Sequence, residues 1–201
     1  MRVAELSELS NVSVASIKFY AREGLLAGNR VGYNQTEYGP EHIVRLRLIK
    51  ALINVAGLSI ASVRRVLEAV DDEQVGVEEV LERAHEAVAP TNLPAVGEET
   101  LQRVRELFDE LGWNVPEDSV GFRQTAAVIS QYEQIGRADL SERASRYGPP
   151  VMDIARGDME AVAQTQDRNT IAQTVVIGTI LGDSMLSAMR KAAREHLSDA
   201  S

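Results

Sequence analysis

The segment Val3-Ala-Glu-Leu-Ser-Glu-Leu-Ser-Asn-Val-Ser-Val-Ala-Ser-Ile-Lys-Phe-Tyr20 has the pattern of two short helices joined by a tight turn. Apolar residues recur at every third position up to Leu9, and Asn11 follows where the chain must turn. We expect Ser13 to cap the second helix, because its hydroxyl can accept a backbone N–H two or three residues further on. The segment therefore predicts a helix-turn-helix.

The second helix combines a small, polar start with an apolar face. Small side chains from Ser13 to Ser16 would let its N-terminus approach base edges in a DNA major groove, where bulky residues would hold the backbone away. Lys18 is long enough to reach a phosphate. Gly24 is predicted to end the helix in a left-handed conformation. The apolar face is predicted to consist of Val14, Ile17, Tyr20 and Ala21.

Residues 27–38 mix turn formers, β-formers and aromatics, which predicts a short hairpin beside the helices. Pro40 fits the first turn of a following helix, and Ser59 can cap a further one through Leu67. Such a hairpin would be a wing that contacts phosphate or the minor groove. Its long donors are Arg30, Tyr33, Asn34 and Gln35.

Charge divides the 201-residue chain into two parts. Residues 1–70 carry nine Lys or Arg against six Asp or Glu, about +3, whereas residues 71–201 carry twelve against twenty-four, about −12. The first part suits a polyanion, while the second would repel one. We therefore predict a DNA-binding domain at 1–75, a short linker or dimerisation helix at 76–92, and an all-helical effector-binding or dimerisation domain at 93–201.

Four pieces in the first part carry a family resemblance. They are Val12-Ser-Val-Ala-Ser-Ile-Lys-Phe-Tyr-Ala-Arg-Glu-Gly-Leu-Leu26, Asn34-Gln-Thr-Glu-Tyr38, Val44-Arg-Leu-Arg-Leu-Ile49 and Gly57-Leu-Ser-Ile60. In this order and register they resemble the DNA-binding domain of the mercury-resistance-regulator (MerR) family. The resemblance covers about a third of the chain. It implies a winged helix-turn-helix that binds double-stranded promoter DNA as a homodimer.

The resemblance also assigns roles. It implies that Tyr20 and Arg22 contact backbone phosphates and that Tyr38 belongs to the wing with Tyr33, Asn34 and Gln35. Tyr20 and Tyr38 could equally be core residues with wetted hydroxyls. The wing is two residues longer than the family's common Gly-Tyr-Arg-x-Tyr and lacks its arginine. Its Asn-Gln variant resembles the redox-sensing branch, but the chain has no cysteine.

The second part is helical by period. Helices are predicted over 77–88, 98–111, 119–135, 150–164 and 167–197, with Pro90 and Pro94 ending the first of them. Together with the acidic charge, this resembles a group of actinobacterial regulators. The fold class is therefore mostly α, a winged helix-turn-helix followed by a helical bundle. Dimer contacts could come from the short 77–89 helix or from the small and apolar residues of the last one.

A small-molecule effector is the signal such a bundle could sense. An inward-turned Arg123, Arg156 or Arg168 would favour an acidic ligand. Large side chains could line a pocket, or could equally fill the core. The candidates are Trp113, Phe122, Tyr132, Tyr147 and Met152.

Enzyme chemistry has little support. His42, His85 and His196 are isolated, and without cysteine the chain has no thiolate ligand or nucleophile. We expect no cofactor, no metal and no catalytic residues. Acidic residues interrupt any signal peptide, and the longest apolar stretch, 175–182, is too short to span a bilayer, which favours the cytoplasm over a membrane.

The sequence thus predicts a transcriptional regulator that binds a pseudo-palindromic promoter site. The family resemblance implies that it remodels promoter DNA for RNA polymerase, while repression is equally open. Two alternatives remain. One is an architectural or recombination accessory protein without an effector, and the other is an interaction protein that has lost DNA binding.

Overall fold

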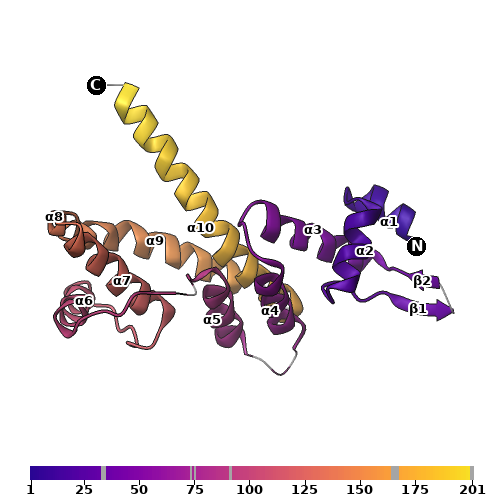
Figure 1. Cartoon of the computed structure of the whole chain (residues 1–201), viewed down its shortest axis with the longest axis horizontal. Helices are drawn as coiled ribbons and strands as arrows, with labels where there is room; N and C mark the ends of the chain where they lie inside the picture. The colour runs from indigo at the N-terminus through magenta and orange to yellow at the C-terminus, as the bar shows by residue number, and fades with distance from the viewer. Residues whose placement is uncertain (33–34, 73, 75, 91, 164–167, 200–201) are drawn as a thin grey trace. The chain divides into compact units, whose positions relative to one another are not determined.

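A computed structural model of the chain describes residues 1–32, 35–72, 74, 76–90, 92–163 and 168–199. These residues are mostly helical, with one two-stranded sheet (Figure 1). The chain divides into two compact units, one of Met1–Val88 with Gln166–Ser201 and one of Ala89–Thr165. The predicted division near residues 75 and 92 differs from this one, because the last helix packs on helices of the first unit.

The first unit begins with the predicted helix-turn-helix and hairpin. The two strands pair antiparallel, with Arg30 opposite Thr36. The predicted helix and hairpin order is confirmed. The elements are α1 (Val3–Ser10), α2 (Val14–Arg22), β1 (Asn29–Gly32), β2 (Gln35–Glu37), α3 (Pro40–Asn54), α4 (Ile60–Asp71), α5 (Val77–Val88) and α10 (Arg168–Asp199).

Three local features of the sequence set these boundaries. Asn11 ends α1 in the left-handed region at φ 54°, ψ 41°, a conformation that asparagine tolerates better than most residues. Gly24 follows α2 at φ 76°, as predicted. The Ser59 hydroxyl accepts the backbone N–H of Ser62 at 3.1 Å and so caps α4.

The core around the helix-turn-helix joins α1, α2, α3 and the end of the hairpin. Leu6, Ile17 and Leu46 are fully buried and pack together, one from each helix. The ring of Tyr38, just after β2, closes this core. Its backbone N–H also donates to the carbonyl of Met1 at 3.0 Å, which ties the hairpin to the residues before α1.

A second layer of the first unit is built by α4, α5 and α10, which pack on one another. Val66, Val80 and Val176 are buried there, one from each helix. Within α10, Ala172–Ser198 is long and apolar enough to cross a membrane by length and composition alone, which goes beyond the short stretch recognised in the sequence. Its N-terminal apolar residues are buried against α5 and α4, whereas 22% of the apolar window as a whole is buried.

The second unit is entirely helical within its described residues. Phe108 and Phe122 meet edge to face with ring centroids 5.8 Å apart, and Phe108 also contacts Trp113 at 5.7 Å. Val104, Ala126 and Ile129 complete this core. The elements are α6 (Glu98–Glu110), α7 (Val120–Gln134), α8 (Ala138–Ser141) and α9 (Ala144–Ala163).

Helix α9 begins six residues before the predicted start at Pro150, and α8 was not predicted. Prolines at 149 and 150 lie inside the first turns of α9, although each lacks a backbone donor. Buried Gly148 explains how this segment docks, because a Cβ there would overlap the Leu111 side chain. Residues 144–149 are thus held in a helix by a tertiary contact, although the prolines in the sequence predict that the helix starts at Pro150.

Candidate nucleic-acid interface

The N-terminus of α2 is organised by two serines. The Ser13 hydroxyl accepts the backbone N–H of Ser16 at 3.1 Å, and the two hydroxyl oxygens lie 2.8 Å apart. Both hydrogen bonds are on the outside of the domain. The cap therefore fixes the first turn of α2 while the same hydroxyls stay accessible to a partner.

Replacing Ser13 with alanine should lower the free energy of unfolding of the first unit by about 1 kcal/mol, because the α2 N-terminus loses its cap. Urea unfolding followed by circular dichroism measures this change. Ser16→Ala is the matched control, since it keeps the Ser13 oxygen that accepts the backbone N–H. An equal loss in both variants would show that the paired hydroxyls, and not the cap, stabilise the turn.

The outward face of α2 carries a patch of small side chains and two cationic side chains. Ala15 and Lys18 are exposed, and the side chain of Arg22 is 72% exposed. The Arg22 guanidinium lies over the ring of Phe19, 5.3 Å from its centroid, which holds it along the helix. Val14 is half-buried and lies at the edge of the patch. This face combines small residues for close approach with cations for phosphate.

Two tyrosines of the predicted contact set pack inward. Tyr20 is half-buried against the helix-turn-helix core. Tyr38 is only 9% exposed, and its ring meets that of His42 edge to face at 5.2 Å. Tyr38 is therefore chiefly a core residue, the alternative weighed above, and its contact with DNA stays a prediction.

The remaining predicted contacts lie on the hairpin. Arg30 is on β1 and Gln35 is on β2, opposite Gly32. Tyr33 and Asn34 lie outside the described residues.

Cations of α3 and α4 brace the helix-turn-helix through its backbone. Arg47 donates to the Leu9 carbonyl and Lys50 to the Asn11 carbonyl, both at 3.0 Å. Arg64 donates to the Glu23 carbonyl at 2.9 and 3.1 Å. These carbonyl groups lie at the C-terminal ends of α1 and α2, where no backbone N–H of the same helix is available to donate to them. Sequence reasoning missed these braces, since their partners are 38 to 41 residues away.

His42 acts as a capping residue at the start of α3. Its Nδ1 accepts the backbone N–H of Gly39 at 2.9 Å, so Nε2 carries the proton and donates to the Ala27 carbonyl at 2.7 Å. The buried ring thereby joins the start of the hairpin to α3. His85 and His196 are exposed. Among the described residues, no three side chains of metal-ligating type lie close enough to hold an ion.

The residues predicted to line an effector pocket are scattered over the second unit. Phe122 is core, Trp113 packs against that core, and Tyr147 is 49% exposed. Tyr132 is half-buried, and Met152 lines an open groove along α9. None of the five lines the cavity between the 89–96 segment and α7 that contains Arg123. The five residues therefore do not share this cavity, and a pocket that they line together stays a prediction.

The comparisons with known proteins agree with the geometry. Residues 1–70 match the model of the MerR HTH family regulatory proteins. A solved structure matches nearly the whole chain, "the putative transcriptional regulator SCO5550 from Streptomyces coelicolor A3(2)", with a TM-score of 0.72 and 29% sequence identity over 98% of this chain and 96% of that one. No curated protein matches the sequence significantly.

A helix-turn-helix whose second helix presents an accessible, cation-bearing face defines a DNA-binding transcriptional regulator. Its residues 1–70 are similar to the DNA-binding domain of the MerR HTH family regulatory proteins.

Proposed function

We propose that the protein is a homodimeric regulator that places α2 in the major groove of each half of a pseudo-palindromic promoter site. The observation that carries the proposal is the outward face of α2, where Ser13, Ala15 and Lys18 are exposed while Ile17 is fully buried. One short helix offers few base contacts, so two copies in register would supply the usual specificity. In this proposal the hairpin touches the flanking backbone through Arg30, Tyr33, Asn34 and Gln35.

The charge of the first seventy residues supports the proposal that two copies are needed to bind DNA. Of the nine cations in the first seventy residues, Arg45, Arg47, Lys50 and Arg64 bind backbone carbonyls within the domain. Fewer positive charges are therefore left for phosphate than the composition suggests. Doubling the interface by symmetry would restore affinity without a more basic surface.

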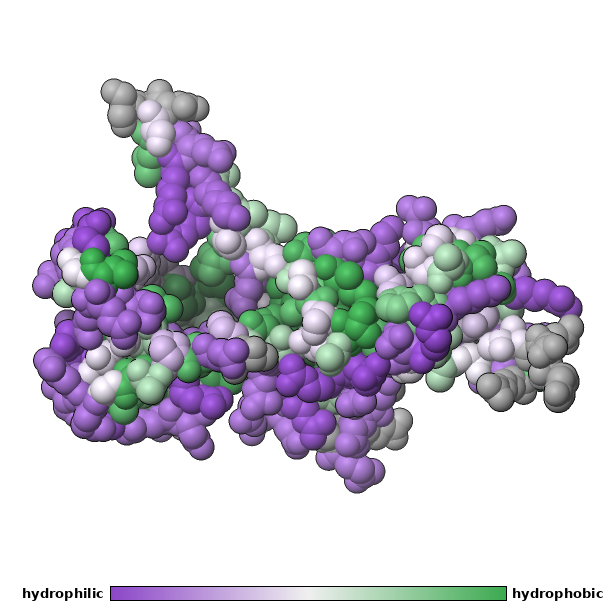
Figure 2. Space-filling view, in the orientation of Figure 1, coloured by the Kyte–Doolittle hydropathy of each residue, from purple (hydrophilic) through white to green (hydrophobic). Residues whose placement is uncertain are grey.

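The C-terminal half of α10 is our proposed dimer contact. Beyond the residues buried against α5, Met185 and Met189 are 62% and 64% exposed and lie four residues apart, on one side of the helix. In Figure 2 this half is mostly hydrophilic on the visible face, with hydrophobic patches at its edges. By contrast, Val80 and Ala84 of α5 are already buried within one copy, which leaves the 77–89 helix with little apolar surface to offer.

Replacing both Met185 and Met189 with glutamate should convert a dimer to a monomer, because like charges would meet across a symmetric helix pair. Sedimentation equilibrium measures the mass, and binding to a two-half-site DNA should weaken in parallel. Val128→Glu is the matched control, an equally exposed apolar residue on α7. A double variant that remains dimeric would place the interface elsewhere.

The proposal also includes a small-molecule effector and the response of the promoter to it. The second unit would sense a small molecule, and the dimer would pass the change to the promoter by bending and underwinding its spacer for RNA polymerase. Footprinting on genomic fragments tests this, with hypersensitive spacer positions and promoter sites expected. Protection confined to recombination sites would favour the architectural alternative.

A further inference from the structure

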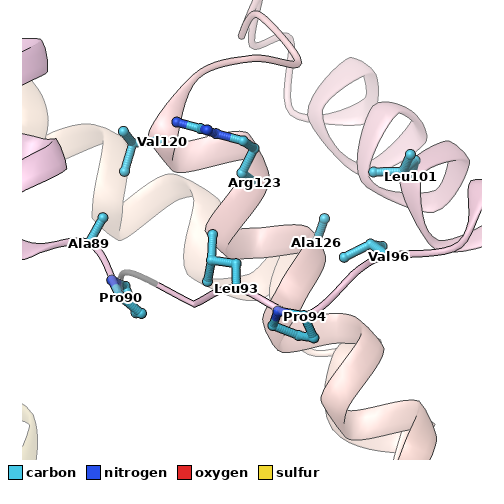
Figure 3. Close-up of a pocket in the computed structure, with 9 residues that line it drawn as sticks. All are labelled: Ala89, Pro90, Leu93, Pro94, Val96, Leu101, Val120, Arg123 and Ala126. Carbon is cyan, nitrogen blue, oxygen red and sulfur yellow. The ribbon is translucent and has the colours of Figure 1, made fainter.

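A cavity of about 360 Å³ lies in the second unit between the segment that follows α5 and helices α6 and α7 (Figure 3). Its size falls within the range of small-ligand sites. Its walls are apolar side chains, and Arg123 is the only charged residue among those that line it. The other lining residues are Ala89, Pro90, Leu93, Pro94, Val96, Leu101, Val120 and Ala126.

The cavity has an inner wall that belongs to the core and a separate outer wall. Ala126 is 1% exposed and belongs to the core of this unit, and Val96 and Leu101 pack against that core. The inner wall is thus continuous with the core, whereas Pro90 and Pro94 form a stiff outer wall, since each proline fixes its own backbone φ. An apolar guest would therefore meet a largely preformed surface.

Arg123 differs from three other arginines of this unit, which have carboxylate partners. Arg103, Arg105 and Arg137 each bind a carboxylate at 2.9 Å or less. Arg123 is exposed and donates only a long hydrogen bond, 3.4 Å, from its Nε to the Ser119 carbonyl. The ion pairs found among the described residues do not include it. In Figure 3 its side chain extends from α7 toward Val120, at the border of the cavity.

A guanidinium without a carboxylate partner, beside apolar walls, favours one chemical class of ligand. A carboxylate would form paired, charge-assisted hydrogen bonds with the exposed terminal nitrogens, while an alkyl or aryl group covers the apolar walls. No acidic side chain is among the described lining residues, so nothing in the cavity opposes an anion. A cation would instead meet Arg123 with a like charge.

We propose that this cavity binds a small amphipathic anion, a carboxylate carried on a compact apolar body, with Arg123 as its charge partner. The inference rests on the proposed sensing role of the second unit and names the ligand class for it. The site lies wholly within residues 89–126, so its occupation requires no contribution from DNA or from a second copy.

The test uses the full-length protein and three probes of equal chain length: octanoate, octan-1-ol and octylammonium. Trp113, the single tryptophan, packs against the same core as Val96 and Leu101, so its fluorescence reports binding. Calorimetry supplies the affinities. We expect octanoate to bind about tenfold tighter than octan-1-ol, and octylammonium to bind most weakly.

Arg123→Gln should remove the preference for octanoate and leave the octan-1-ol affinity unchanged, while Arg123→Lys should retain part of it. Arg146→Gln is the matched control, because it removes an exposed positive charge of the same unit outside the cavity. Equal binding of octanoate and octan-1-ol, no binding of octanoate, or an equal loss in the Arg146 variant would each overturn the inference.

The same titrations with promoter DNA present separate this inference from the proposed function. Octanoate binding that depends on Arg123 but leaves DNA binding and promoter distortion unchanged would support the site and overturn its sensing role. DNA binding without any Arg123-dependent ligand would overturn the site and leave the DNA-binding proposal standing.

Discussion

Ile17→Ala is expected to lower the free energy of unfolding of the first unit by about 3 kcal/mol. Ile17 is fully buried where α2 meets Leu6 of α1 and Leu46 of α3, so alanine loses apolar contact and leaves a cavity that rigid helices cannot close. Urea unfolding followed by circular dichroism measures the loss. Binding to promoter DNA should weaken as well, because α2 would no longer be held in position.

Two comparisons make this result specific. Val44→Ala on α3 removes two carbons, against three in Ile17→Ala, from a side chain that is 52% exposed, and we expect a change within about 0.5 kcal/mol. Trp113 fluorescence reports the second unit, whose core contains no residue of α2, so its unfolding midpoint should not move. A shift of that midpoint in the Ile17 variant would show that the units unfold together.

Much of the DNA-binding fold could be predicted from local signals. Asn11, Ser13 and Gly24 each act through their own backbone or through a residue within one turn, so the sequence alone contains the cause. The same holds for the serine cap of α4 and for Gly112 after α6, at φ 70°. Helix boundaries set by caps and left-handed residues were therefore predicted closely.

Features that depend on distant partners could not be predicted. Arg47 and Lys50 have the same helical spacing whether they face solvent or bind carbonyls of the turn, and only the folded chain decides between these states. Arg123 was predicted to favour an acidic ligand if turned inward, whereas Phe122 and Trp113, predicted to line a pocket, pack in or against the core. Aromatic residues in a small helical unit serve packing first, since they bury the most surface.

Replacing Lys18 and Arg22 together with alanine is expected to weaken promoter binding by about a hundredfold at physiological salt. Both side chains project from the exposed face of α2, and each would neutralise a phosphate in both halves of the site, four contacts in all. The slope of log affinity against log salt should fall by about 3 to 4, and the loss should be similar for specific and unrelated DNA. Fluorescence anisotropy across a salt series measures both quantities.

The control must carry the same net charge, because an acidic chain of −9 repels DNA at long range whatever residues are changed. Arg143→Ala with Arg146→Ala removes two exposed positive charges from the second unit, so it reproduces that effect without touching α2. We expect this control to retain the salt slope and nearly all of the affinity. An equal loss in both variants would mean that α2 does not contact phosphate through Lys18 and Arg22, and a loss confined to one DNA sequence would place these side chains at bases.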